Sequence, residues 1–525
     1  MQNFGVALRR NFYIKLGIFL LLLTWLGILA AGKIDLTTTD LGRHLKNGEI
    51  LWNEGLKIGQ VGTVLNSNFF SYTNAGYPFV NHHWASGVIF FLVHKFAGFA
   101  GLSFFHILLT LLTFAVFFHI ARRESDFPTA AILSFLLIPL IAERREIRPE
   151  VWSVFFSAVF FFLLWKYSRG KMSWKWLLAL APLQIAWVNL HIYFFLGIFL
   201  AGCFWFSEIA EVFFRKMSDD EFAGSVKRTK VLTAALVLVV LASLVSPFGL
   251  EGFLYPFKIL GTSGYTLVEN KSVSFVEGYG ISNPNFLLVR AVLALAAASF
   301  VLLFVVGRRK NVALFLSLAV FFGVFGWMAI RNFTLLGFFA LVILAWCIGG
   351  IFSLREKKRS LIQENGIAVV YILVFLVAAV GNFQFAGRHF KNFGVGLLPE
   401  NQKAAEFLKN EKIKGPIFNN YDIGSYLIYN LYPEQKVFVD NRPEAYPDAF
   451  FSEVYKPMQE DPAVFEKADR EYNFNAVVFA RNDITPWGMN FLKTIGENPG
   501  WGKVFEDDFA VVYKNSRIEE RMNNE

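Results

Sequence analysis

The segment AERREIRPEV, residues 142–151, places three arginines and three glutamates between two strongly apolar stretches. Upstream, the segment DLGRHLKN carries Asp40, Arg43 and His44 at three- and four-residue spacing, so a helix would align them on one face. Arginine side chains at the ends of apolar segments are suited to bind a phosphate or a carboxylate. A carboxylate or an imidazole within hydrogen-bond reach can take a proton from a hydroxyl or an amine. These residue types therefore predict an anion site next to a general base.

The elements that position these residues are predicted to lie in a membrane. The chain has 525 residues, of which 55% are hydrophobic, and its mean hydropathy is +0.44. Several apolar runs reach the length of about 20 residues that a bilayer core requires. The formal net charge of +9 indicates no nucleic-acid partner, because lysine and arginine in a membrane protein mark the cytoplasmic loops. Both cysteines, Cys203 and Cys347, lie inside apolar runs, so we expect no disulfide framework. The composition predicts an α-helical polytopic membrane protein.

Hydropathy predicts about eleven spanning helices. They cover residues 13–32, 102–120, 128–142, 151–167, 174–190, 192–209, 231–245, 286–306, 312–330, 333–352 and 367–383. The first follows Arg9 and Arg10 and lacks a small-residue cleavage site, so we expect a retained signal anchor. Residues 84–96 are apolar but short, and we expect this helix to lie flat in the membrane interface.

Basic loops predict the orientation of these helices. With the N terminus inside the cell, every inside segment is basic: residues 122–123, 166–175, 214–230, 308–310 and 355–359. This is the positive-inside pattern, and it would fail if residues 84–96 spanned the membrane. We therefore expect a transmembrane domain, residues 1–386, whose first outer loop covers residues 33–101 with interfacial helices. An extracytoplasmic domain, residues 387–525, is expected to follow it.

Polar residues that could bind a ligand collect on the predicted outer side. The candidates are Arg43, Arg144, Arg145, Arg148, Arg331, His82, His83, Asn189, His191 and Glu277, in addition to Asp40 and His44. Ionisable groups at helix ends are costly and usually face a polar cavity, so we expect one outward-open cavity. Arg331 lies in a two-residue link between long apolar runs. We expect it to meet a lipid phosphate or a carboxylate such as Glu143 or Glu146.

Simpler interpretations exist for several of these groups. The segment ERREIRPE could be a solvated loop with local ion pairs, and Asn189 with His191 could be part of an interfacial belt. His82 and His83 could form a metal pair, but adjacent side chains on a helix diverge and no third ligand is implied by the spacing. We therefore favour hydrogen bonding to a substrate over a metal site for this pair.

Five segments follow one another in a recognisable order: TTTDLGRHLKNGEIL, SYTNAGYPFVNHHW, RPE, WVNLH and RNF. In this order they resemble the GT-C superfamily of membrane glycosyltransferases, which includes protein mannosyltransferases and bacterial aminoarabinose transferases. The resemblance covers most of the chain and is greatest to uncharacterised bacterial members with a soluble outer tail. It implies transfer of a sugar from a polyprenyl-phosphate donor to a glycan, lipid or protein acceptor. The reaction would take place at the outer face of the bacterial plasma (inner) membrane.

The resemblance also implies catalytic residues. The family's acidic residue in the first outer loop matches Asp40, with Asp35 as the second match. Many members have an adjacent acidic pair, whereas Leu41 follows Asp40 here, so the role of Asp40 and a need for a divalent cation stay open. A lipid-phosphate leaving group is already ionised and needs cations more than a general acid. Asp40 or His44 would serve as the base of an inverting displacement.

Two other functions are compatible with the sequence. A transporter or flippase of lipid-linked sugar would need charge along the span, with gates on both sides, whereas the polar groups here cluster on one face. A catalytically inactive assembly protein with the same fold is the other alternative, because the acidic pair is broken.

The less apolar segment 387–525 alternates predicted helices and strands, which indicates a small α/β domain. The stretch KVFVDNRPEAY is expected to be a strand with charge just past its carboxyl end, where ligand sites of α/β sheets lie. A surface loop with Arg442 paired to Glu444 is the alternative. The segment has no glycine-rich phosphate loop, so we predict no nucleotide site.

Overall fold

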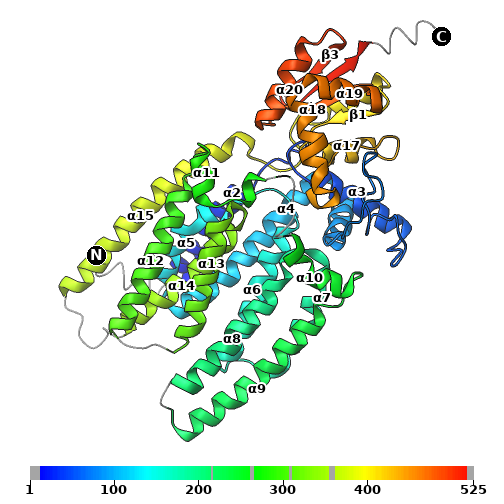
Figure 1. Cartoon of the computed structure of the whole chain (residues 1–525). Helices are drawn as coiled ribbons and strands as arrows, with labels where there is room; N and C mark the ends of the chain where they lie inside the picture. Colours follow the sequence, from blue (N-terminus) through cyan, green and yellow to red (C-terminus); the bar gives the residue numbers. More distant parts are fainter. Residues whose placement is uncertain are drawn as a thin grey trace.

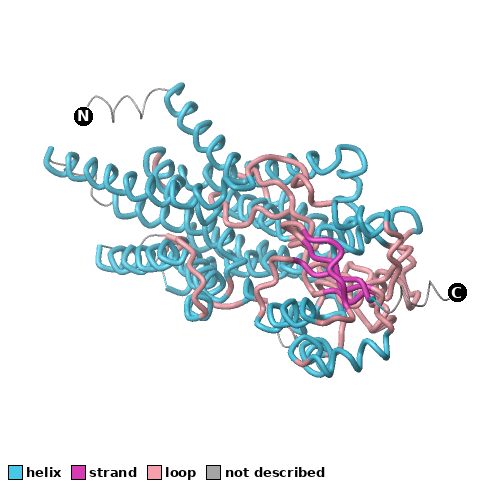
Figure 2. Tube along the Cα trace, turned by 90° about the horizontal axis from the view of Figure 1, so that it is seen from above, coloured by secondary structure: helices cyan, strands magenta, loops and turns pink. Residues whose placement is uncertain are grey.

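Long helices build the larger part of the molecule, and a small domain with a β-sheet lies at one end of them (Figure 1). The computed structural model describes residues 12–214, 217–259, 265, 267–306, 310–353 and 361–516. Seen from above, the strands gather at one end of the helical part (Figure 2).

Seven helical segments among the described residues are long and apolar enough to cross a membrane. They lie on α2 (Phe12–Ala30), α4 (Trp84–Glu124), α6 (Glu150–Ser168), α8 (Phe195–Phe214), α12 (Asn285–Val306), α14 (Phe333–Ser353) and α15 (Leu361–His389). The bundle also contains α5 (Phe127–Ile141), α7 (Leu180–Leu190), α9 (Asp219–Ala242) and α13 (Val312–Met328). The prediction of a helical polytopic membrane protein is confirmed.

Each of the eleven predicted spans coincides with a helix of the structure. Which helices cross the membrane, and in which direction, stays a prediction. Several basic residues on which the orientation depends lie outside the described residues: Arg9, Arg10 and residues 215–216, 308–309 and 355–359.

The helix predicted to lie flat in the interface forms the first part of α4. Gly98, with φ 61°, interrupts the helical conformation between residues 84–96 and the following apolar stretch. A positive φ of this size is easily adopted only by glycine. Gly98 therefore separates α4 into the two segments that hydropathy predicts.

The helix α3 (Leu41–Glu54) carries the first candidate residues and packs against α4 and against α17 (Gly424–Leu431). A Cβ atom at Gly48 would lie 2.0 Å from the carbonyl oxygen of Gly87 in α4. A Cβ atom at Gly42 would lie 2.6 Å from the carbonyl oxygen of Ser425 in α17. Glycine at these two positions thus lets α3 lie directly on the backbones of both neighbours.

The C-terminal domain contains a four-stranded sheet with the order β1-β2-β4-β3. The strands are β1 (Ile417–Asn419), β2 (Ala476–Ala480), β3 (Trp501–Glu506) and β4 (Ala510–Asn515). β1 and β2 are parallel, and the pairs β2–β4 and β4–β3 are antiparallel. The accompanying helices are α16 (Lys403–Asn410), α17, α18 (Lys456–Glu460), α19 (Pro462–Tyr472) and α20 (Pro486–Glu497). This mixed sheet with helices confirms the predicted small α/β domain.

The expectation of a sheet strand in KVFVDNRPEAY is wrong. Val437 forms an isolated parallel bridge with Ser71 of the first outer loop and lies outside the four-stranded sheet. The backbone N–H of Val437 donates to the carbonyl oxygen of Phe70, and that of Tyr72 donates to the carbonyl oxygen of Val437. The segment therefore joins the C-terminal domain to the first outer loop.

Arg442 completes this junction. It is 1% exposed and pairs with Asp440 at 2.6 Å, not with Glu444 in a surface loop. Its Nη2 donates to the side-chain oxygen of Asn68 at 3.1 Å, and its guanidinium lies 4.8 Å from the ring centre of Phe79. The first outer loop is thus held on the C-terminal domain by Arg442, whose guanidinium is fixed by a buried ion pair with Asp440.

Candidate active site

Asp40 lies at the start of α3, and its side chain is 20% exposed. Its Oδ2 accepts a hydrogen bond from Nη2 of Arg43 at 3.3 Å and lies 3.2 Å from Nε2 of His44. Its Oδ1 is buried without a hydrogen-bond partner among the described residues. The Nε atom of Arg148 lies 4.0 Å from this Oδ1. One carboxylate oxygen is therefore fixed, while the other faces a cation and can accept a further hydrogen bond.

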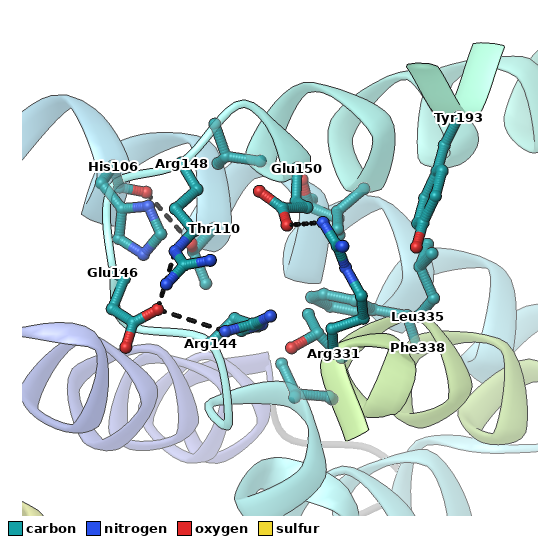
Figure 3. Close-up of a pocket in the computed structure, with 15 residues that line it drawn as sticks. His106, Thr110, Arg144, Glu146, Arg148, Glu150, Tyr193, Arg331, Leu335 and Phe338 are labelled. Carbon is teal, nitrogen blue, oxygen red and sulfur yellow. Dashed lines mark hydrogen bonds and ion pairs between the residues drawn. The ribbon is translucent and has the colours of Figure 1, made fainter. Parts of the chain in front are cut away.

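Three arginines line a pocket among the helices (Figure 3). The residues around it are His106, Thr110, Thr113, Ile141, Arg144, Glu146, Arg148, Glu150, Val151, Val154, Tyr193, Arg331, Thr334, Leu335 and Phe338. They come from α4, α5, α6, α14 and the connections between helices. The pocket combines charged groups with apolar side chains, a combination that suits an amphiphile with an anionic head.

Two carboxylates bridge two of these arginines. Glu269, in the short helix η3 (Val268–Asn270), accepts from Arg144 at 2.9 Å and from Arg148 at 3.0 Å. Glu146 lies 3.2 Å from Arg144 and 2.9 Å from Arg148 (Figure 3). A bound anion would therefore compete with these carboxylates for the same N–H groups.

Arg331, in η4 (Ile330–Asn332), forms the third cation of the pocket. It pairs with Glu150 (Figure 3), not with Glu143 or Glu146 as expected. Its Nη1 donates to Asn270 at 2.9 Å. Glu143 instead accepts hydrogen bonds from two asparagines near the start of α12. Glu150, the partner of Arg331, is the first residue of helix α6.

Four of the predicted histidines lie together beside Asp40. The ring centres of His44 and His83 are 5.6 Å apart, and those of His83 and His191 are 5.0 Å apart. The ring centres of His82 and His83 are 3.9 Å apart. The first outer loop, the start of α4 and the end of α7 thus bring their imidazoles to one place.

The electrostatics of this region keep its carboxylate ionised and its imidazoles neutral. Burial alone would raise the pKa of Asp40, but His44, Arg148 and Arg43 hold that pKa well below its usual range. Burial and the nearby Arg43 lower the pKa of His44. Burial lowers the pKa of His82 to about 3. At neutral pH the pair formed by Asp40 and His44 is therefore a carboxylate next to a neutral imidazole.

Three predicted site residues belong neither to the lining of the arginine pocket nor to the contacts among Asp40, Arg43 and the four histidines. Arg145 donates to the carbonyl oxygen of His389 at 3.0 Å. Asn189 accepts from the indole N–H of Trp84 at 3.0 Å. Glu277 forms an exposed ion pair with an arginine of α12. The structure gives these side chains contacts that position helices and loops.

Sequence reasoning missed several residues that line the pocket or pair with its arginines. Glu269 has arginine partners 121 and 125 positions away along the chain, so no local spacing marks it. Glu150 belongs to the segment ERREIRPE, and a search for a carboxylate at the start of an apolar helix could have found it. Tyr193 and His106 stand within apolar runs, where only the packing of the helices shows which way they face.

The residues around Asp40 do not fit a divalent-cation site. In the part of the chain that the structure describes, no group of three His, Cys, Asp or Glu side chains is arranged to hold a metal ion. The guanidinium Nε of Arg148 lies 4.0 Å from the unpartnered oxygen of Asp40. Positive charge at this point is supplied by arginine.

Sequence comparison gives little. No family model matches the chain. An uncharacterized protein of Aquifex aeolicus (strain VF5) is 36% identical over 90 residues, and the match covers 16% of this chain and 18% of that protein.

Comparison of structures is more informative. The apo oligosaccharyltransferase of Archaeoglobus fulgidus has a TM-score of 0.62 at 12% identity, over 97% of this chain and 75% of that chain. The complex of this archaeal enzyme, AglB, with an inhibitory peptide and a dolichol-phosphate has a TM-score of 0.58 over the same shares. Its complex with Zn and sulfate has a TM-score of 0.57 at 12% identity, over 96% of this chain and 73% of that chain. The likeness extends over nearly the whole chain and shows that it shares the fold of this archaeal oligosaccharyltransferase.

Proposed function

We propose that this chain, which has the GT-C fold, transfers a sugar from a polyprenyl-phosphate donor to an acceptor at the outer face of the plasma membrane. The position of Asp40 carries the proposal. Its unpartnered carboxylate oxygen lies 4.0 Å from Arg148, which lines the arginine pocket. A proton acceptor and an anion-binding group therefore lie side by side.

The donor phosphate would bind in the arginine pocket. Arg144, Arg148 and Arg331 offer guanidinium groups, whose planar N–H pairs match phosphate oxygens. The apolar side chains of α6 and α14 lie beside them, where the first isoprene units of the carrier would pack. A dolichol-phosphate bound to a protein of the same fold supports a lipid-phosphate ligand.

The acceptor would be activated by Asp40 and His44. A hydroxyl or amine of the acceptor donates to the free oxygen of Asp40 and attacks the anomeric carbon of the sugar. The new bond forms as the bond from that carbon to the phosphate oxygen breaks, and its electron pair goes to the phosphate held by the arginines. The acceptor's proton passes to the Asp40–His44 pair. A single displacement of this kind inverts the anomeric centre.

The outer face is proposed from the charge of the loops. Basic segments are expected at the cytoplasmic ends of the helices, which would put Asp40 and its arginines on the outside. In a transporter, polar groups would be expected along the whole path. The acceptor class, whether glycan, lipid or protein, is not part of the proposal.

A divalent cation is not assigned a role in this proposal. A protein of the same fold binds Zn and sulfate, but here Arg148 stands beside the free oxygen of Asp40. If arginine supplies the charge, a chelator such as EDTA should leave transfer unchanged.

The test is a transfer assay on the purified chain with radiolabelled polyprenyl-phosphate sugars. The variant Asp40→Asn should lower transfer at least about 100-fold, the usual scale of a lost general base. Glu49→Gln is the matched control, because Glu49 lies on the same helix and pairs with Lys46, with a side chain 41% exposed. It should transfer at the rate of the parent protein.

Other outcomes would change the conclusion. Equal transfer by the parent protein and Asp40→Asn would remove Asp40 from the reaction. Donor binding without turnover in any of the three proteins would favour the transporter or the inactive assembly protein.

A further inference from the structure

A closed circuit of contacts begins and ends at Asp40. Its first half, the charged arm, runs from Arg148 to Glu269 and, through the adjacent Asn270, to Arg331. The Arg331 guanidinium lies 5.7 Å from the ring centre of Tyr193. These residues supply the anion-binding part of the pocket.

The second half of the circuit, the histidine arm, returns from Tyr193 through His191, His83 and His44. The ring of Tyr193 lies 4.8 Å from that of His191, centre to centre. His83 stands between His191 and His44, and His44 contacts Asp40. The two arms therefore share Asp40 at one end and the Tyr193–Arg331 contact at the other.

Members of the circuit keep buried polar atoms that have no partner among the described residues. They are Oδ1 of Asp40, Nδ1 of His44, Nε2 of His83, Nε2 of His191 and Nε of Arg331. Buried polar groups in native proteins are nearly always paired with protein, water or ligand. Five such atoms on one circuit are available to water or to a polar ligand.

The hydrogen bonds of His191 define what it offers. Its Nδ1 accepts from the backbone N–H of Tyr193 at 3.4 Å and lies 2.6 Å from the hydroxyl of Ser153. A backbone N–H can only donate, so Nδ1 carries no proton and the neutral ring carries it on Nε2. His191 therefore offers an unused donor.

His44 offers the opposite group. Its Nε2 lies 3.2 Å from Oδ2 of Asp40, which can only accept, and 3.3 Å from Nη2 of Arg43, which can only donate. Because Nη2 of Arg43 already donates to the same carboxylate oxygen, we assign the proton of the neutral ring to Nε2, which leaves Nδ1 as an unused acceptor. The histidine arm thus presents a donor at one end and an acceptor at the other. A sugar hydroxyl, which both donates and accepts, matches this arrangement.

We propose that the histidine arm is the seat of the transferred sugar, and that it selects a sugar without ionised groups. The proposal rests on the proposed function and names its substrate class. The carboxylates at the two ends, Asp40 and Glu150, are already matched by arginines. An ammonium group among these rings would meet neutral imidazoles, and the one unpartnered carboxylate oxygen, Oδ1 of Asp40, already faces Arg148 at 4.0 Å. Its buried charge would therefore be poorly paired, which is disfavoured. A carboxylate on the sugar would meet Asp40 as a like charge.

The experiment measures binding of three probes to the full chain in lipid nanodiscs: undecaprenyl phosphate, its ester with a neutral hexose, and its ester with an amino sugar. The variant His191→Asn is informative, because the asparagine oxygen can replace Nδ1 as acceptor for Tyr193 while the Nε2 donor is lost. His83→Leu removes the middle ring. His94→Asn is the control, since His94 packs on Phe99 and lies outside the circuit.

The neutral hexose should raise the affinity about tenfold over undecaprenyl phosphate in the parent protein and in His94→Asn, the scale of one or two hydrogen bonds. His191→Asn and His83→Leu should lose most of this gain and bind undecaprenyl phosphate as the parent does. The amino sugar should give no gain in any protein.

Three results would overturn the proposal: a hexose that adds no affinity, a histidine variant that weakens all three probes equally, or an amino sugar that binds better than the hexose. Failure of all three probes to bind the parent protein would overturn the proposed function as well. Binding of undecaprenyl phosphate, which carries no sugar, therefore separates the two proposals. If it binds but the hexose adds no affinity, only the sugar site is refuted; if it does not bind, the donor site is refuted as well.

Discussion

At the scale of residues, Asp40 remains ionised although it is largely buried. Moving a carboxylate away from water is costly unless cations and hydrogen bonds replace the solvent. Here Arg43 and His44 hold one oxygen, and Arg148 faces the other. The same arginine also contacts Glu146 and Glu269. Arg148 thus links the carboxylate to the anion pocket, and its loss should affect both.

We expect Arg148→Gln to lower kcat/KM for sugar transfer by about 100-fold or more, the scale of a lost electrostatic contact to the leaving group. Arg145→Gln is the matched control, because Arg145 lies in the same loop but bonds the carbonyl oxygen of His389. It should change kcat/KM less than threefold, on the order expected of a surface change. Steady-state rates and gel filtration of both variants provide the measurement. Equal losses in the two variants would show that the loop, not the position of Arg148, matters.

Buried neutral histidines predict that the protein loses stability in mild acid. In the unfolded chain a histidine titrates near pH 6.5, whereas burial lowers the pKa of His82 to about 3 and that of His83 well below its usual value. The unfolded state therefore binds more protons below pH 6.5. Stability is fully present above that pH and falls as the pH is lowered, by up to about 1.4 kcal/mol per pH unit for each histidine.

Thermal inactivation measured between pH 7.5 and pH 5 tests this dependence. The midpoint temperature should fall with pH, and the fall should be smaller in His82→Gln, which has no group that titrates there. Asp40 does not contribute to this fall between pH 7.5 and 5, because its pKa is lowered. The stability that its ionised form contributes is lost only below about pH 4, as the carboxylate becomes protonated. A midpoint that is constant from pH 7.5 to 5 would contradict the prediction.

At the scale of elements, the site depends on how α3 is held. The helix lies directly on α4 and α17 through Gly48 and Gly42. The loop that follows it is fastened to the C-terminal domain by Arg442, Asp440 and Asn68. The C-terminal domain therefore takes part in placing Asp40, although it contributes no residue to the lining of the arginine pocket.

Breaking the buried pair at this junction should destabilise the protein strongly. Asp440→Asn leaves the guanidinium of Arg442 buried without its carboxylate, at a cost of about 3–5 kcal/mol in the free energy of unfolding. The double variant Asp440→Leu/Arg442→Met removes both charges and should be less destabilised than Asp440→Asn. Thermal unfolding of the two proteins measures the difference. A double variant as unstable as the single one would show that packing, not charge, holds the junction.

At the scale of the whole molecule, the sequence predicts the helices better than the contacts between distant segments. Apolar runs identify spanning helices because hydropathy is a local property. The segment around Val437 has the composition of a strand, but its partner, Ser71, lies in the first outer loop. Glu269 is equally remote from its arginines along the chain, so the sequence does not distinguish it from Glu277 in the same connection, which pairs with an arginine of α12. Long-range pairing of this kind requires the folded structure.

Orientation in the membrane is the property of the whole molecule that the sequence predicts and the structure leaves to experiment. Single cysteines can test it, because Cys203 and Cys347 are both buried. Glu466, on α19, and Lys171, in the connection after α6, are both exposed. In intact cells, a membrane-impermeant maleimide should label Glu466→Cys and leave Lys171→Cys unlabelled until the cells are opened. The positive-inside pattern requires this result, since residues 166–175 are basic. Labelling of Lys171→Cys in intact cells would reverse the topology and place the arginine pocket on the cytoplasmic side, where the donor would have to be bound from the inner leaflet.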